Sequence, residues 1–285
     1  MTYDEQLHHL VSEALQEDIG DGDHSTLSCI PAGQRGKAVL RIKQEGILAG
    51  VAVAGKIFRQ QDPRCVFQAF KNDGDRMMPG ETAFEVEAPA HLILECERLV
   101  LNCMQRMSGI ATLTRSYAEK IKGYHTKILD TRKTTPNFRL LEKEAVRIGG
   151  GVNHRFALYD MIMLKDNHID FCGGIVPAIE KASAYVRDQK PGLKIEVETR
   201  TIDDVKQVIA AGKGKVFRIL LDNLLPAQIS EALDLIKNDF ETEASGGIHL
   251  DNIEEYAKTG VDYVSIGALI HQARSLDLSL KAVIV

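Results

Sequence analysis

The sequence lacks paired cysteines, an excess of basic residues and any long apolar run. Its five cysteines form no Cys-x-x-Cys pair, a pattern that favours reduced thiols in a cytosolic protein. The net charge of -5 argues against a surface built to bind nucleic acid, which needs a basic face. No apolar run approaches the ~20 residues that cross a bilayer. The amino terminus also lacks the basic and apolar regions of a signal peptide, so we expect a cytoplasmic protein.

The composition is that of an ordinary globular protein, with 285 residues, 44% of them hydrophobic and 26% charged. In the first part of the chain, the spacing of apolar residues predicts helices over 4–16 and 51–61. Alternating apolar residues predict strands over 37–43 and 82–87. They predict a small α+β domain over residues 1–112. A long helical pattern runs from 91 to 122, and Gly109 is expected to break it into two helices.

After residue 122 the pattern changes to short apolar runs, each followed by a helical stretch. The runs are 127–131, 161–165, 194–198, 217–222, 240–245 and 263–267. Strands that alternate with helices predict a parallel sheet. The first strand of this region is not followed by a Gly-x-Gly-x-x-Gly turn, so evidence for a dinucleotide-binding sheet is missing. Because six units fall short of the usual eight, we expect an incomplete β/α barrel over 113–273. The tail, 274–285, contains an alternating stretch and is expected to pack back on the first domain.

Polar or glycine residues stand where each predicted strand ends. They are Thr131 to Thr134, Lys165 to His168, Glu198, Asp222–Asn223, Ser245 to Gly247, and Gly267–Ala268. A single such residue is as well explained as a helix cap or a loop residue. In a barrel, however, the carboxyl ends of the strands face one cavity, so six such ends together predict an active site there.

The predicted cavity is mostly cationic. Its positive or protonatable residues are Arg132, Lys133, His154, Arg155, Lys165 and His168. Arginine binds carboxylate and phosphate oxygens in pairs, so we expect a strongly anionic ligand. The loops that start at Ser245 and Ser265 could offer backbone N–H groups to a phosphate. Glu198 and Asp222 could form structural salt bridges, hold Mg²⁺ directly or through water, or stabilise developing positive charge.

Two other classes of protein fit the same residues. A Schiff-base lyase could use Lys133 or Lys165, since lysines in barrels act as nucleophiles when they lose their proton. A non-catalytic anion-binding protein could use the same cations without any turnover.

Eight motifs together resemble those of the quinolinate phosphoribosyltransferase family, the carboxylating nicotinate-nucleotide pyrophosphorylases. They are EDIGDGDHST (17–26), ERLVLNCMQRMSGIAT (97–112), DTRKTTPNFR (130–139), GGGVNHR (149–155), LKDNHI (164–169), EVET (196–199), LLDN (220–223) and ASGGI (244–248). The resemblance covers almost the whole chain. It implies an amino-terminal α/β sandwich domain, an incomplete barrel, and a homodimer whose active sites are shared between subunits. The implied reaction joins quinolinate to phosphoribosyl pyrophosphate with Mg²⁺, as a step of NAD synthesis.

The resemblance also implies roles for individual residues. Quinolinate carboxylates would be bound by Arg132, His154 and Arg155, and Lys133 and Lys165 would neutralise part of the negative charge. Thr131 would also belong to the substrate-binding residues. Arg98 would reach the site of the partner subunit, whereas Lys43 stands where some relatives have arginine. Glu198 and Asp222 would lie beside the ribose and its Mg²⁺, with Lys133, Lys165, Glu198 and Asp222 as the catalytic residues. The 5-phosphate would be held by Ser245, Gly246 and Gly247 and by Ser265, Ile266 and Gly267.

Overall fold

The computed structural model describes residues 1–283, which form two compact units that interleave along the chain. The first unit comprises Met1–Arg115, Thr134–Gly150 and the segment that begins at Leu269. The second comprises Ser116–Lys133 and Gly151–Ala268. Within residues 1–283, no helix combines the length and the apolar character that crossing a membrane requires.

An antiparallel sheet organises the first unit. Its strand order is β12-β1-β5-β3, with the bounds Leu278–Val283, Arg35–Ile42, Thr82–Pro89 and Val66–Ala69. A separate short pair joins β2 (Gly46–Ile47) to β4 (Arg76–Met77). The carboxyl-terminal strand β12 pairs with β1, so the end of the described chain belongs to this sheet. The last two residues of the predicted tail, 284–285, lie outside the described residues.

The helices of the first unit are α1 (Tyr3–Ile19), α2 (His24–Cys29), α3 (Val51–Gln61), α4 (Ala90–Lys120, which continues into the second unit) and α5 (Arg139–Gly149). Thr2 and Glu5 form a capping box that fixes the start of α1. Helix α1 ends at Ile19, three residues later than predicted, and is followed by Gly20, whose positive φ of 57° is readily adopted by glycine. Asp23 then caps α2 through the Thr26 N–H, so this acidic stretch serves as turn and cap.

The predicted break at Gly109 is wrong, because α4 runs without interruption through this position. A Cβ on Gly109 would lie 2.0 Å from the carbonyl oxygen of Arg274. The glycine therefore permits a close backbone approach within the first unit and does not end a helix.

A six-stranded parallel sheet organises the second unit and confirms the predicted incomplete barrel. Its order is β6-β11-β10-β9-β8-β7, with the bounds Lys127–Leu129, Tyr263–Ser265, Glu241–Ser245, Arg218–Asp222, Ile195–Thr199 and Ile162–Leu164. Within the described residues the two edge strands β6 and β7 do not pair with each other. Instead, Val152 bridges to Leu129 of β6, so the segment after α5 lies along the open edge.

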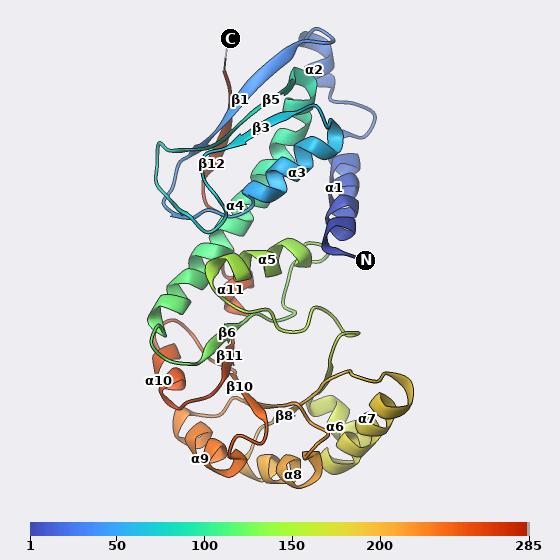
Figure 1. Cartoon of the computed structure of the whole chain (residues 1–285), viewed down its shortest axis with the longest axis vertical. Helices are drawn as coiled ribbons and strands as arrows, with labels where there is room; N and C mark the ends of the chain where they lie inside the picture. The colour runs from blue at the N-terminus through green and yellow to red at the C-terminus, as the bar shows by residue number, and fades with distance from the viewer. Residues whose placement is uncertain (284–285) are drawn as a thin grey trace. The chain divides into compact units, whose positions relative to one another are not determined.

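Helices cover the outer face of this sheet. They are α6 (Asp166–Cys172), α7 (Ile175–Gln189), α8 (Ile202–Gly212), α9 (Pro226–Ile236) and α10 (Ile253–Lys258), whereas the short α11 (Ala268–His271) belongs to the first unit from Leu269 on. Figure 1 shows α7, α8, α9 and α10 along the outside of the curved strands. Val197 of β8 and Ile219 of β9 are partners in the strand register, and both are buried. Burying each such apolar side chain contributes about 1.5–3 kcal/mol to stability.

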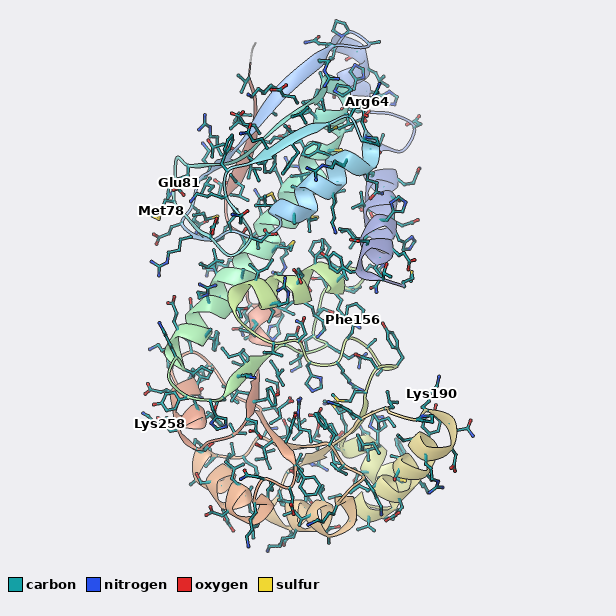
Figure 2. All side chains as sticks on the ribbon, in the orientation of Figure 1. Arg64, Met78, Glu81, Phe156, Lys190 and Lys258 are labelled. Carbon is teal, nitrogen blue, oxygen red and sulfur yellow. The ribbon has the colours of Figure 1, made fainter. Side chains whose placement is uncertain are left out.

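The inner face of the sheet is unusually polar. Along β8, Ile195 and Val197 alternate with Glu196 and Glu198, so both glutamates share one face. Barrel interiors are more often filled by branched apolar side chains. Figure 2 shows that side chains fill the space inside the curved strands. The strand alternation therefore places charged groups in the barrel interior, below the predicted mouth.

Candidate active site

Four strands bring predicted catalytic residues to the carboxyl end of the barrel. Lys165 follows β7 and its Nζ lies 3.1 Å from Oε2 of Glu198, near the end of β8. Asp222, the last residue of β9, accepts hydrogen bonds from the Ser245 hydroxyl and from Nδ2 of Asn223, the latter at 2.7 Å. The structure thus places these residues at one end of the sheet, as expected for a shared mouth.

The turn after β10 is fixed by two glycines in the left-handed region. Gly246 has φ 87° and Gly247 has φ 64°. A Cβ on Gly246 would lie 2.1 Å from Oδ1 of Asn223, whereas a Cβ on Gly247 would meet no atom within 4 Å. Gly246 therefore serves a close approach between two strand ends, and Gly247 faces open space where a ligand can come near the backbone.

The second predicted phosphate loop is largely committed to the barrel. Ser265 is buried and its hydroxyl hydrogen-bonds Glu243. The Ile266 N–H donates to the carbonyl of Leu129 at 3.0 Å, and Ile266 is only 2% exposed. Of the two predicted loops, the structure therefore favours Ser245–Gly247 over Ser265–Gly267 as the binding site for a phosphate.

The loop after β6 presents two of the predicted cations. Arg132 and Lys133 are exposed, and the Lys133 N–H donates to Oγ1 of Thr131 at 3.1 Å. The pKa of the Arg155 guanidinium is lowered by burial and then by repulsion from Arg132. That repulsion indicates that the two guanidinium groups lie near each other, while Nη1 of Arg155 donates to the Met161 carbonyl at 2.9 Å. An anion that lies between two such cations would relieve it.

The segment that carries Arg155 is held by Asp130, a residue that the sequence analysis did not single out. Asp130 is 0% exposed and its two oxygens accept from the His154 N–H at 2.8 Å and from Nδ2 of Asn153 at 2.7 Å. A buried carboxylate at a strand end needs such donors. Its place at the end of the first apolar run was a signal for it in the sequence.

His154 belongs to a cluster of buried charges. Its side chain is 5% exposed, and its Nε2 lies 3.0 Å from Glu196 and 3.3 Å from Glu243. Nη1 of Arg218 lies 2.8 Å from Glu243. We call His154, Glu196, Glu243 and Arg218 the buried charge network. The other three members were not predicted from the sequence, because only the carboxyl ends of strands were considered there, whereas Glu196 and Glu243 lie within strands and Arg218 begins β9.

The pKa of His154 reflects this surrounding. Burial lowers it, but hydrogen bonds and attraction from Glu196 and Glu243 outweigh burial and raise the pKa to about 9. The prediction that His154 grips a substrate carboxylate has little support in this geometry. Nε2 faces the two glutamates, and Nδ1 lies 2.6 Å from the backbone nitrogen of Arg155.

The buried charge network has the spacing of a metal site but not its charge. Within residues 1–283, His154, Glu196 and Glu243 offer ligand atoms within 4.8 Å of one another. The Arg218 guanidinium already neutralises Glu243, and two carboxylates favour a protonated ring, which cannot donate a lone pair to a metal. An ion-pair network therefore accounts for this cluster better than a metal ion does.

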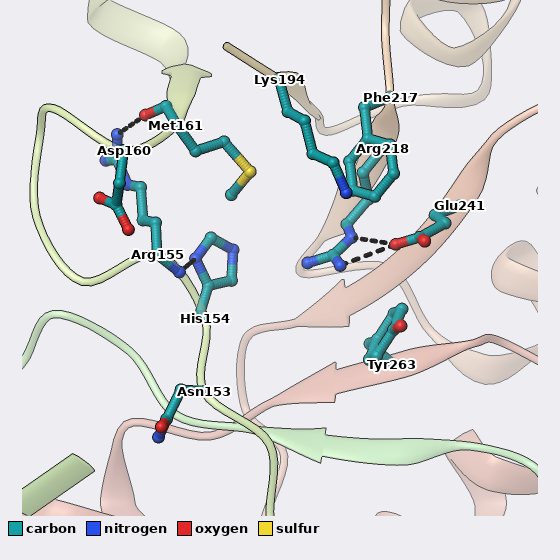
Figure 3. Close-up of a pocket in the computed structure, with 10 residues that line it drawn as sticks. All are labelled: Asn153, His154, Arg155, Asp160, Met161, Lys194, Phe217, Arg218, Glu241 and Tyr263. Carbon is teal, nitrogen blue, oxygen red and sulfur yellow. Dashed lines mark hydrogen bonds and ion pairs between the residues drawn. The ribbon is translucent and has the colours of Figure 1, made fainter. Parts of the chain in front are cut away.

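A cavity of about 290 Å³ opens at the amino ends of the strands. Figure 3 shows it between Lys194, Arg218 and Glu241 on one side and His154, Arg155 and Met161 on the other. Arg218 and Glu241 are the first residues of β9 and β10, so this cavity lies toward the end opposite Asp222. His154 and Arg218 of the buried charge network line this cavity, and so does Arg155.

Two predicted residues belong to the other unit. Arg98 is exposed on α4, and Lys43 is exposed just after β1, with its N–H donating to Asp277. Their predicted roles concern a partner subunit. His168 is used locally, because its Nδ1 accepts the Lys165 N–H at 3.1 Å at the start of α6.

Comparison with known proteins identifies two matching domain families. Residues 110–281 match the family described as the quinolinate phosphoribosyl transferase C-terminal domain, and residues 23–108 match the corresponding N-terminal domain. Quinolinate phosphoribosyltransferase (decarboxylating) 1b of Nicotiana tabacum is 43% identical over 98% of this chain and 83% of its own length. A probable nicotinate-nucleotide pyrophosphorylase (carboxylating) of Bacillus subtilis is 43% identical over 96% of this chain and 93% of its own.

Solved structures agree with these relatives. The crystal structure of NadC from Streptococcus pyogenes superposes with a TM-score of 0.89 at 40% identity, covering 98% of both chains. The structure of the nicotinate-nucleotide pyrophosphorylase from Francisella tularensis gives a TM-score of 0.87 at 36% identity, covering 98% of this chain and 97% of that one.

Proposed function

Because the chain belongs to the quinolinate phosphoribosyltransferase family, we propose that it transfers a phosphoribosyl group to quinolinate with loss of carbon dioxide. The products would be nicotinate mononucleotide, pyrophosphate and carbon dioxide, in NAD synthesis. One observation of the structure supports this most: Lys165 and the carboxylates of β8 and β9 stand at the carboxyl ends of the strands, and Arg132 and Lys133 are exposed on the loop after β6. A dicarboxylate and a sugar that becomes cationic need these two kinds of group side by side.

Quinolinate is assigned to the cationic region. Arg132 and Arg155 repel each other across it, and Lys133 stands beside Arg132 on the same loop. Two carboxylates would neutralise these groups in paired hydrogen bonds. Thr131 would shape the turn that presents them, since its hydroxyl already accepts the Lys133 N–H.

The phosphoribosyl donor is assigned to the ends of β8, β9 and β10. Its 5-phosphate would lie on the backbone of Ser245–Gly247, where Gly247 leaves open space. Its ribose would then lie near Glu198 and Asp222. As the bond from C1 to the diphosphate breaks, the electron pair leaves with pyrophosphate and positive charge develops on the ribose. The two carboxylates would stabilise that charge electrostatically.

The pyridine nitrogen completes the transfer. Its lone pair forms the bond to C1, and the ring nitrogen becomes positively charged. The bond from C2 to its carboxylate then breaks, carbon dioxide leaves, and the electron pair stays on C2 until C2 takes up a proton. In this proposal Lys165 holds Glu198 at 3.1 Å and keeps that carboxylate fixed during the reaction.

Mg²⁺ is part of the proposal as a companion of the diphosphate. Asp222 and Glu198 are carboxylates of the kind that Mg²⁺ accepts, but each already has a partner, Ser245 and Lys165 respectively. They therefore suit an ion held through water better than one held directly. When bound, the ion would neutralise charge on the leaving pyrophosphate.

A homodimer with shared sites is also proposed, with Arg98 reaching the partner's mouth. Its support is the family membership and the exposure of Arg98 on α4. A cytosolic location is proposed as well, because all five cysteines are free thiols.

Site sharing is tested by mixing two inactive variants. Arg98→Ala subunits mixed with Lys165→Ala subunits should regain part of the activity, since one composite site in the mixed dimer would be intact. A sample that contains only Arg98→Ala subunits, treated in the same way, is the control and should stay inactive. Verified mixed dimers that stay inactive would contradict site sharing.

The reaction itself is tested with the purified chain, quinolinate, phosphoribosyl pyrophosphate and Mg²⁺. Nicotinate mononucleotide and carbon dioxide should form in equal amounts, as measured by mass spectrometry and trapped gas. Nicotinate, which lacks the 2-carboxylate, is the matched acceptor and should react far more slowly. Equal use of both acceptors, or no product, would refute the proposed function.

A further inference from the structure

The buried charge network spans the barrel interior from three strands. Glu196 comes from β8, Arg218 from β9 and Glu243 from β10, and all three are buried. Arg218 bonds Glu243 at 2.8 Å and Glu241 at 2.8 Å, which ties two neighbouring strands together. Glu196 lies 3.0 Å from His154, which is not on a strand. The strands therefore hold the His154 ring from inside the barrel.

His154 in turn abuts the backbone of Arg155. Its Nδ1 lies 2.6 Å from the Arg155 nitrogen, while Asp130 holds the His154 N–H at 2.8 Å. The Arg155 guanidinium then donates to the carbonyl of Met161 at 2.9 Å, just before β7. Arg155 is thus fixed at its backbone and at its tip, and the backbone contact depends on where the ring sits.

Two observations point to different protonation states of the His154 ring. A hydrogen bond from the Arg155 N–H to Nδ1 requires a neutral ring, whereas Glu196 and Glu243 raise the pKa of His154 to about 9 although burial lowers it. The hydrogen bond at 2.6 Å describes a ring that carries its proton on Nε2, where it faces Glu196. A ring protonated on both nitrogens would set two N–H groups against each other and would have to move away from the Arg155 nitrogen.

We propose that Glu196, Glu243 and Arg218 are positioning residues for quinolinate binding: they seat the His154 ring, and the ring holds the backbone of Arg155 in place. This inference rests on the proposed function, and it assigns a role to groups that touch neither substrate. A buried network of four charges contributes little to stability compared with apolar packing of the same volume. Its position between the strands and Arg155 gives it a specific task.

The test compares two glutamate-to-glutamine variants. Glu196→Gln keeps the shape of the side chain but removes one of the two carboxylates that face His154. Glu180→Gln makes the same chemical change at an exposed ion pair with Lys215 in the same unit. For each variant, kcat and the KM values of quinolinate and phosphoribosyl pyrophosphate are measured near neutral pH.

Glu196→Gln should raise the KM of quinolinate at least ~10-fold, with kcat and the KM of phosphoribosyl pyrophosphate changed less than ~3-fold. Glu180→Gln should match the unchanged chain. A quinolinate KM within ~2-fold of the unchanged chain, or equal rises for both substrates, would overturn the proposal. An unchanged chain without activity would instead refute the proposed function, so the two failures are distinguishable.

A second variant covers the case in which Glu196→Gln does not fold. Glu243→Gln leaves Glu196 facing the ring and should show the same selective rise in the KM of quinolinate. Quinolinate binding without turnover, measured by calorimetry, should weaken by the same factor. Unweakened binding by the folded variant would overturn the proposal.

Discussion

Gly246→Ala is the substitution whose effect follows most directly from the geometry at the mouth. Gly246 has φ 87°, and an added Cβ would lie 2.1 Å from Oδ1 of Asn223 and 3.0 Å from its Cα. The left-handed conformation alone costs alanine about 1–2 kcal/mol. Because Asn223 also donates its N–H to the Ser245 carbonyl at 2.8 Å, it cannot move away without breaking that bond.

The neighbouring glycine supplies the matched control. Gly247 has φ 64°, but an added Cβ would meet no atom within 4 Å. Gly247→Ala should therefore lose only the conformational cost of about 1–2 kcal/mol. Gly246→Ala should lose a further ~1–3 kcal/mol for the enforced repacking. At about 2–4 °C per kcal/mol for a protein of this size, its melting temperature should be lower than that of Gly247→Ala by at least ~2 °C.

The assay combines thermal unfolding with kinetics. Gly246→Ala should also raise the KM of phosphoribosyl pyrophosphate more than that of quinolinate, because displacing Asn223 disturbs Asp222, whose carboxylate it contacts. Equal melting temperatures for the two alanine variants would contradict the close contact with Asn223 and refute the reasoning.

Three other predictions follow from the same structure. Gly109→Ala should destabilise the protein by about 1–3 kcal/mol in urea unfolding, because its Cβ would meet the Arg274 carbonyl at 2.0 Å, and an unchanged midpoint would argue against that contact. Glu198→Ala should lower kcat at least ~10²-fold in steady-state kinetics, and near-normal turnover would remove Glu198 from the mechanism. The raised pKa of His154, about 9, stabilises the fold fully below its unfolded value of about 6.5. That contribution, at most about 3 kcal/mol, should be lost as pH rises through about 9, and His154→Gln should abolish this part of the pH dependence of unfolding.

Local patterns in the sequence predicted much of the fold. Helix α3 occupies 51–61 as its periodicity indicated, and the six apolar runs became the six barrel strands. These succeed because hydrophobic periodicity is set by the face that each element buries. The helix break predicted at Gly109 was wrong because the glycine is needed for the close approach of the Arg274 carbonyl, which lies far along the chain. No local rule distinguishes a glycine that ends a helix from one that admits another segment.

The candidate site was predicted unevenly for a similar reason. Lys165, Glu198, Asp222 and Ser245 stand at strand ends, where barrel topology alone brings residues together. Glu196 and Glu243 lie within strands, and their role appears only when neighbouring strands and His154 meet in space. The alternation of glutamate with apolar residues in 195–198 marked an inward polar face, but it did not name the partner.

The central claim is that an acceptor dicarboxylate lies at the carboxyl ends of the strands, between Arg132 and Arg155. A crystal structure of the protein with bound quinolinate tests it most directly. We expect quinolinate carboxylate oxygens at about 2.7–2.9 Å from guanidinium nitrogens of both Arg132 and Arg155, with the ring on the side of Glu198 and Asp222. Because Arg155 also lines the cavity beside Lys194 and Glu241, quinolinate bound in that cavity and away from Arg132 would contradict the claim.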